Sequence, residues 1–134
     1  MTLSKTLKYY SAIGRRKTAR ARVRLYKGKG KIKINDQDWK KYFPQLVHQE
    51  IVIAPLKELG VEKKFDLSIL IRGGGIKAQA EAARLGISWA LVEFKPEWKV
   101  QLKALGYLSR DPRGRERKKY GLKRARRAAQ WTKR

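Results

Sequence analysis

The pattern of apolar and polar positions predicts a strand between Thr18 and Tyr26, where the two kinds of residue alternate strictly. An alternation with a period of two is what a half-buried strand requires. One face would be apolar, carrying Ala19, Ala21, Val23 and Leu25. The other face would be a comb of arginines, Arg20, Arg22 and Arg24. We therefore expect one face to pack against a core and the other to remain at the surface.

Two further segments show the same alternation. The stretch KGKG, 27–30, has the glycines that a tight turn needs, and KIKIN follows with Ile32 and Ile34 facing inward. A basic hairpin is the simplest interpretation of 18–35. In FDLSILIRGGG, apolar residues alternate from Phe65 to Ile71, and Leu70 on the opposite side indicates a strand partly covered on both faces.

Helical spacing appears in three places. Residues 45–60 predict a helix that is kinked or broken before Pro55, because proline removes a backbone donor and clashes with the preceding turn. Residues 76–94 have apolar positions at helical intervals, and 96–106 repeat that pattern after a proline that suits a helix start. Mixed strands and helices predict an α+β fold, with one sheet packed against one helical layer.

The chain has 134 residues, the usual size of one domain. Apolar periodicity ends after Leu105. We therefore expect a globular α+β domain over residues 1–108, of which 1–8 need not be ordered, and an extended basic tail over 109–134. The tail has too little apolar surface to offset its ordering entropy, apart from a possible helical turn or two over 122–130.

The formal charge is +24, and it is concentrated at both ends of the chain. Residues 1–24 carry eight basic and no acidic residues, 25–108 carry fifteen against nine, and 109–134 carry twelve against two. A pI near 10.8 makes nucleic acid the default partner, with an acidic membrane surface as the second candidate.

Several functional classes are disfavoured by what the sequence lacks. It has no cysteine and a single histidine, His48, so disulfides, thiolate metal sites and catalysis by paired imidazoles are excluded. Asp36 and Asp38 resemble turn and capping residues, and no nucleophile has an identifiable base. We expect no enzyme activity, cofactor or metal. No apolar run resembles a signal peptide or a membrane span, which favours a cytosolic or otherwise internal protein.

The first candidate interface is GRRKTARARVR, 14–24. Lysine and arginine donate to phosphate oxygens, and the planar arginine fork can also stack on a base. A solvated strand face would be expected to have acidic neighbours, but none precedes Asp36, so we favour nucleic-acid contact. Four aromatic residues lie among these basic residues, namely Tyr9, Tyr10, Tyr120 and Trp131. Their rings could stack on unpaired RNA bases. Each tyrosine taken singly, however, is better explained by packing at the edge of the domain. Trp131 differs because nothing near it in the sequence can form a core, and a specific contact with RNA or protein is as plausible there as none.

The second candidate is RGGG, 72–75, directly before the helix expected from Ile76. Its backbone N–H groups and the helix start could form an anion nest for an RNA phosphate. The glycines could equally serve to turn a strand closely against a helix. The segment matches neither GxxxxGK[ST] nor GxGxxG, so it is a poor nucleotide-site signal.

Several segments together resemble the family of ribosomal protein S9 of the small subunit. They are GRRKTARARV and KGKGKIKIN, Tyr42 with Phe43, FDLSILIRGGG leading into Gln79 and Ala80, Arg110 with Asp111, and ERKKYGLKRARRAAQWTKR. The resemblance runs from about Tyr9 to the last residue. The chain departs from the family at Ala78 and Glu81, where glycines are usual, and in QWTKR, where Phe and Ser commonly precede the final Lys-Arg pair.

The resemblance implies the fold of the second domain of ribosomal protein S5 and a place in the head of the small subunit, on 16S-type rRNA beside other head proteins. It implies that the tail threads toward the peptidyl site, so that Lys133 and Arg134 meet tRNA phosphates. Together with the basic segments, it predicts the following rRNA-binding residues: Arg15, Arg16, Lys17, Arg20, Arg22, Arg24, Arg72, Arg110, Arg113, Arg115, Arg117, Lys118, Lys119, Lys123, Arg124, Arg126 and Arg127. We expect a structural ribosomal protein of the cytoplasm, or of an organelle.

Three alternatives remain open at the level of sequence. The first is a free-standing RNA-binding protein or RNA chaperone that uses the same surfaces. The second is a phosphotransferase-like enzyme with RGGG as its phosphate loop, which the missing acid, metal and lysine constellation disfavours. The third is a membrane-active cationic protein, for which the tail offers only a poor apolar helical face.

Overall fold

The structure is a computed structural model that describes residues 9–109; residues 1–8 and 110–134 lie outside that description. The elements in this range are β1 (Tyr10–Arg16), β2 (Ala19–Lys27), β3 (Ile32–Ile34), β4 (Gln37–Asp38), α1 (Trp39–Tyr42), α2 (Leu46–Leu59), β5 (Phe65–Arg72), α3 (Ile76–Phe94) and α4 (Trp98–Ala104). The division between a globular domain and a tail stays a prediction, because the tail falls outside the described residues.

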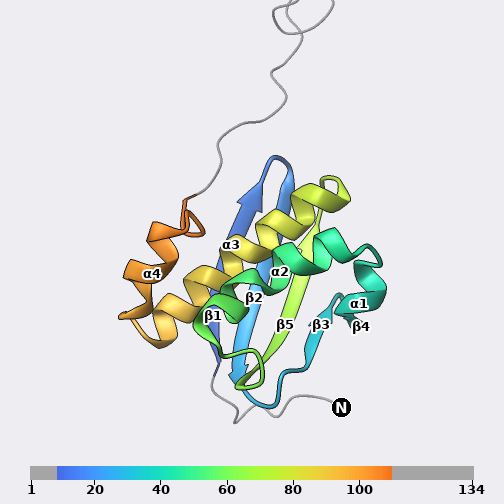
Figure 1. Ribbon diagram of the computed structural model, residues 1–134. Coiled ribbons are helices and arrows are strands. Elements are labelled where there is room, and N and C mark those ends of the chain that lie inside the picture. The colour runs from blue at the N-terminus through green and yellow to red at the C-terminus, as the bar shows by residue number, and fades with distance from the viewer. Residues whose placement is uncertain (1–8, 110–134) are drawn as a thin grey trace, which may run out of the picture.

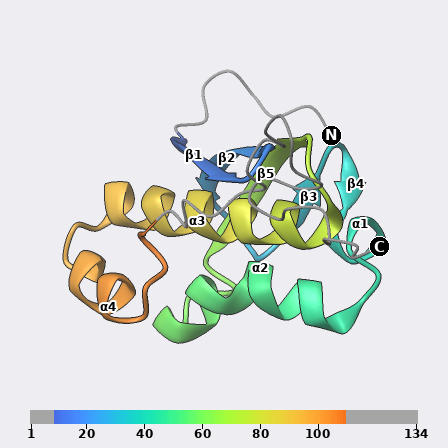
Figure 2. The same ribbon diagram turned by 90° about the horizontal axis from the view of Figure 1, so that it is seen from above.

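The strands form one five-stranded sheet in the order β1-β2-β5-β3-β4, in which only β3 and β5 run parallel. The helices lie on one side of the sheet, with α3 running along it and α2 beside α3 (Figures 1 and 2). The core is the apolar face of the sheet against these helices, with Val23, Ile34, Leu56 and Ile87 completely buried. The predicted α+β class is confirmed.

The predicted basic hairpin of 18–35 is wrong. Although β2 and β3 are consecutive, β2 pairs with β1 and β5, and β3 pairs with β4 and β5. The loop between β2 and β3 passes the end of β5, where Asp66 Oδ1 accepts hydrogen bonds from the backbone N–H groups of Lys29, Gly30 and Lys31. These bonds hold the loop to β5, so β3 lies on the far side of β5 from β2.

Two of the three predicted helices differ from expectation. Helix α3 has the predicted bounds, and α4 is shorter than predicted. Helix α2 is not broken before Pro55, one of the two alternatives predicted, but continues through it to Leu59, and a kink there stays a prediction. Pro55 is buried together with Val52 and Leu56, so packing offsets the hydrogen bond that the proline removes.

Strand β1 and helix α3 approach so closely that their backbones touch. A Cβ atom added at Gly14 would overlap the carbonyl oxygen of Ala82, and one added at Gly86 would lie 2.7 Å from Val23 Cγ2. Gly14 and Gly86 therefore allow a contact that no larger residue would permit without movement. This contact fixes the edge of the sheet against the helix layer.

Leu70 is not covered as predicted. It is 44% exposed, and no helix of the described part of the chain lies on its side of the sheet (Figure 2). The sheet therefore has one packed face and one open face.

Candidate nucleic-acid interface

The open face of the sheet is defined here by the outward side chains of four strands. Alternation along each strand and the pairing register place the following residues on it: Ser11, Ile13, Arg15, Arg20, Arg22, Arg24, Tyr26, Lys33, Asp66, Ser68, Leu70 and Arg72. Six of these twelve are cations. The arginine comb predicted for β2 thus lies on the open face, with Arg20 and Arg22 exposed and Arg24 half-buried.

Three arginines stand directly opposite one another on adjacent strands. Arg15 of β1 pairs in register with Arg20 of β2, which pairs in turn with Arg72 of β5. We call this set the arginine row. Like charges placed opposite each other in a sheet are destabilising, so a row of three favours an anion that neutralises it.

The next row along the strands combines apolar and charged groups. Arg22 lies between Ile13 and Leu70, which are 46% and 44% exposed. An arginine plane with apolar neighbours is a surface on which an unpaired base can stack, whereas the arginine row suits phosphates.

A third row contains Arg24, with Ser11 and Ser68 opposite it on either side. The Arg24 guanidinium lies 5.1 Å from the centre of the Tyr9 ring, and that ring lies 5.5 Å from the ring of Tyr26. The stacking holds Arg24 in a defined orientation. Tyr10, by contrast, packs edge-on against Phe94 at 5.3 Å, as expected for a tyrosine at the domain edge.

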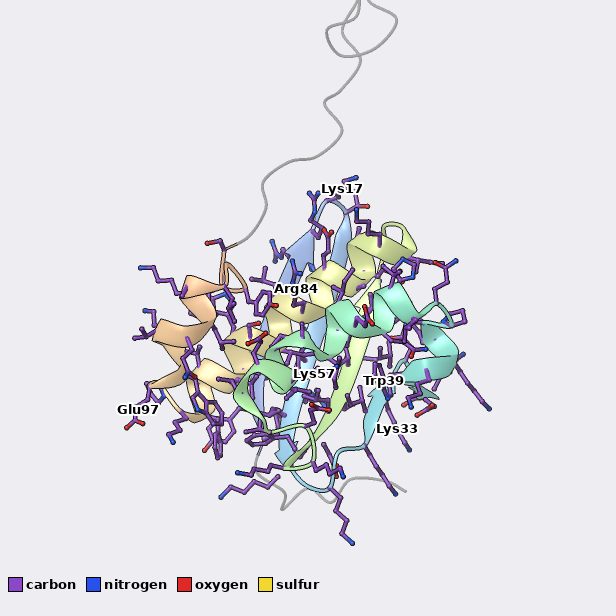
Figure 3. All side chains as sticks on the ribbon, in the orientation of Figure 1. Lys17, Lys33, Trp39, Lys57, Arg84 and Glu97 are labelled. Carbon is purple, nitrogen blue, oxygen red and sulfur yellow. The ribbon has the colours of Figure 1, made fainter. Side chains whose placement is uncertain are left out.

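On the open face, acidic groups lie only at the end opposite the arginine row. Asp38 is paired in register with Lys33, and Asp66 is engaged by the three backbone donors of the β2–β3 loop. Cations without acidic neighbours in register therefore gather around the arginine row and the adjoining turn. Lys17 lies in that turn with a φ of 55° and projects from its tip (Figure 3).

Arg16 differs from the other predicted contacts because it lies on the packed side. Its Nε donates to Glu81 Oε2 of α3 at 2.6 Å, and both side chains are largely buried. The pair ties the end of β1 to the helix. Sequence alternation could have indicated this, since Arg16 follows Ala12 and Gly14 at intervals of two.

The RGGG turn has a structural role that the sequence left open. Gly73 and Gly74 have φ values of 75° and 70°, which favour glycine, and an added Cβ at either would crowd Thr18 or Ala19. The Gln79 side chain donates to the Gly73 carbonyl at 3.0 Å and accepts from the Tyr42 hydroxyl at 2.8 Å. The interpretation of a close strand-to-helix turn is supported, and a phosphate contact there stays a prediction.

The remaining predicted nucleic-acid contacts lie outside the described residues. For rRNA they are Arg110, Arg113, Arg115, Arg117, Lys118, Lys119, Lys123, Arg124, Arg126 and Arg127; for tRNA they are Lys133 and Arg134. Tyr120 and Trp131 lie outside as well.

Within residues 9–109, no group of three or more histidine and acidic residues is arranged to hold a metal ion. His48 is half-buried and lies near the Phe43 ring, at 6.1 Å between ring centres. The same part of the chain has no helix long and apolar enough to cross a membrane.

Comparison with known proteins agrees with this geometry. Residues 14–134 match the family described as ribosomal protein S9/S16. The chain belongs to the ribosomal protein S9/S16 family. It is 51% identical over 126 residues to small ribosomal subunit protein uS9 of Porphyromonas gingivalis, covering 94% of this chain and 98% of that one. Over 128 residues it is 46% identical to the uS9 protein of Thermus thermophilus, covering 96% and 100%.

Membership of the S9/S16 family confirms the resemblance seen in the sequence, and with it the expectation of a structural protein without enzymatic activity. A uS9 protein of Mycobacterium leprae is 50% identical over 122 residues, which are 91% of this chain and 80% of its own. Not all residues of the open face were among the predicted contacts, and those that were missed include Ile13, Lys33 and Leu70. Their alternation with buried neighbours was visible, but the register that brings them beside the arginines was not.

Proposed function

We propose that this protein is a structural constituent of the small ribosomal subunit that binds 16S-type rRNA in the head, with neighbouring head proteins as further partners. The observation that carries the proposal is the arginine row of Arg15, Arg20 and Arg72 on a sheet face that no described helix covers. Membership of a ribosomal protein family supports it independently. The site of action would be the ribosome of the cytoplasm or of an organelle.

The open face would bind RNA mainly by neutralising phosphates. Each phosphate paired with a lysine or arginine releases condensed counterions, so affinity falls steeply as salt rises. The cations of the face are held on a rigid sheet, which reduces the entropy lost on binding. Ile13, Arg22 and Leu70 would add a contact with an unpaired base, which depends less on salt.

The second part of the proposal concerns the C-terminal sequence. Residues 109–134 carry twelve basic residues against two acidic ones and include the Lys-Arg pair with which the family's pattern closes. We infer that this segment passes between rRNA backbones and that Lys133 and Arg134 contact the phosphates of peptidyl-site tRNA. Both cations would stabilise tRNA without reading its sequence.

The rRNA contact can be tested with two double variants of equal net charge. Replacing Arg20 and Arg72 by Gln removes two members of the arginine row. Replacing Lys57 (Figure 3) and Lys99 by Gln instead removes two exposed cations from α2 and α4, which lie on the helix side of the sheet (Figure 2). We expect Arg20→Gln/Arg72→Gln to weaken binding to a head fragment of 16S-type rRNA and to reduce the slope of log K against log salt by about 2.

The control Lys57→Gln/Lys99→Gln should retain most of the affinity. Equal affinities and slopes for the two double variants would show that the open face does not bind the RNA. Sedimentation of cell extract then distinguishes a ribosomal constituent, which travels with small subunits, from a free-standing RNA-binding protein or chaperone.

A further inference from the structure

A second cationic site lies at the β1 edge of the sheet, between β1 and the helices, and borders the open face. It is a cavity of about 150 Å³ between β1, α3 and the segment that follows α4. Its wall includes Arg15, Arg16, Glu81, Arg84, Tyr107 and Ser109. No local pattern of residues indicates this cavity, because its wall comes from segments that are far apart in the chain.

The charges of this cavity favour an anion. Three arginines line it against a single carboxylate, and that carboxylate is already paired with Arg16. Arg84 makes no ion pair with any residue in the described part of the chain; its guanidinium lies 5.1 Å from the centre of the Tyr107 ring. A guanidinium stacked on a ring keeps its N–H donors free at the edge, where they can reach an oxyanion.

The wall opposite α3 is held in place before any ligand binds. Leu108 is buried, and its carbonyl accepts a hydrogen bond from the Trp89 indole at 3.2 Å. The Tyr107 N–H donates to the Leu102 carbonyl at 3.1 Å. Tyr107 is therefore held beside Arg84, and Ser109 directly follows the anchored Leu108, which reduces the ordering that a ligand would have to induce.

The position of the cavity connects it to the proposed interface. Arg15 lines the cavity and is also the outermost member of the arginine row. Strand β1 is the edge of the sheet, so a polyanion lying across the arginine row would meet the cavity as it passes that edge.

We propose that this cavity binds a phosphate group of the RNA backbone, with Arg84 as its principal donor and the Ser109 hydroxyl as a second. The proposal rests on the proposed function, since it takes the ligand to be the same RNA. Glu81 lowers the net positive charge of the cavity, because its carboxylate forms an ion pair with Arg16. A single phosphodiester matches a cavity of this size and polarity better than a base, which needs an apolar platform.

The test uses the full chain and the head fragment of 16S-type rRNA as probe. We expect Arg84→Gln to weaken binding about tenfold and to reduce the salt slope by about 1, because one charged contact is lost. We expect Glu81→Gln to strengthen binding, because it removes the only carboxylate of the wall. Lys57→Gln is the matched control for a single lost cation and should have a much smaller effect.

Thermal unfolding of each variant separates a binding effect from a folding effect, and Glu81→Gln keeps the test informative if Arg84→Gln proves unstable. A folded Arg84→Gln that binds the RNA as wild type does, with the same slope, would overturn the proposal. Failure of the wild-type protein to bind the RNA at moderate salt would instead contradict the proposed function itself.

Inorganic phosphate, titrated at constant ionic strength, distinguishes an RNA phosphate from a free ion. We expect it to shift the backbone amide resonances of Tyr107 and Ser109 in wild type but not in Arg84→Gln. If phosphate shifts them while Arg84→Gln leaves RNA affinity unchanged, the cavity is a site for small anions and the RNA assignment is wrong.

Discussion

The RGGG turn depends on two side chains that reach it from other elements. Gln79, in the first turns of α3, donates to the Gly73 carbonyl, and the Tyr42 hydroxyl at the end of α1 donates to the Gln79 carbonyl oxygen. The tyrosine thereby fixes which end of the amide faces the turn. Arg72, which precedes the glycines, is in this way held at its place in the arginine row.

Replacing Tyr42 by Phe should test this link without disturbing the ring packing against Phe43. We expect the free energy of unfolding to fall by about 0.5–1.5 kcal/mol at neutral pH, since one hydrogen bond is lost. Urea denaturation would measure it. Gln79→Leu should have a larger effect, because the Gly73 carbonyl then loses its partner as well.

The stability difference between wild type and Tyr42→Phe should depend on pH, because Tyr42 titrates and phenylalanine does not. Burial raises the pKa of Tyr42 above its ordinary value of 10.0, against hydrogen bonds with Gln79 and Asn35 that lower it. As pH rises past 10 the unfolded chain loses this proton first, so the folded state binds more protons and stability falls. The advantage of wild type over Tyr42→Phe should shrink above pH 10, and an advantage that stays constant to pH 11 would contradict this.

For the helices and strands, the sequence predicted the local features, namely where an element lies, but not how the strands pair. The period of two over 18–26 and 65–71 located β2 and β5, and helical spacing gave both ends of α3. Pairing was not predictable, because the loop after β2 is redirected by Asp66, 35–37 residues away. For the same reason the arginine comb of β2 was visible but the arginine row was not, since it needs the register of three strands.

The contact of β1 with α3 is the element pairing most sensitive to substitution. We expect Gly14→Ala to lower the free energy of unfolding by about 1–3 kcal/mol, because its methyl group meets the Ala82 backbone, which cannot move without shifting the helix. Urea denaturation would measure the loss. The matched control is Gly75→Ala, where an added Cβ meets nothing within 4 Å and φ is −89°.

Gly75→Ala should stay within about 0.5 kcal/mol of wild type. Equal stabilities for the two variants would show that the strand can retreat from the helix. The comparison also bears on the interface, since movement of β1 would carry Arg15 out of register with Arg20.

For the whole molecule, the positive charge is divided between a folded surface and a terminal sequence. The open face holds its cations in fixed rows on a sheet, whereas residues 110–134 carry twelve basic residues in a sequence with few apolar ones. The proposed roles differ accordingly. The folded part would anchor the protein on rRNA, and the terminal sequence would extend the contact to tRNA.

This division predicts that the two roles separate on deletion of Lys133 and Arg134. The deletion leaves residues 9–109 and 33 of the 35 basic residues intact, so assembly into small subunits should continue nearly unchanged. Affinity of the purified subunits for peptidyl-site tRNA should fall, and the salt slope of that binding should fall by about 1 to 2, as expected for two lost phosphate contacts.

Replacing both residues by Gln, which keeps the chain length, should have the same effect if the tRNA contact depends on charge rather than on chain length. Unchanged tRNA affinity in both variants would remove the tRNA contact from the proposal and leave the rRNA contact standing.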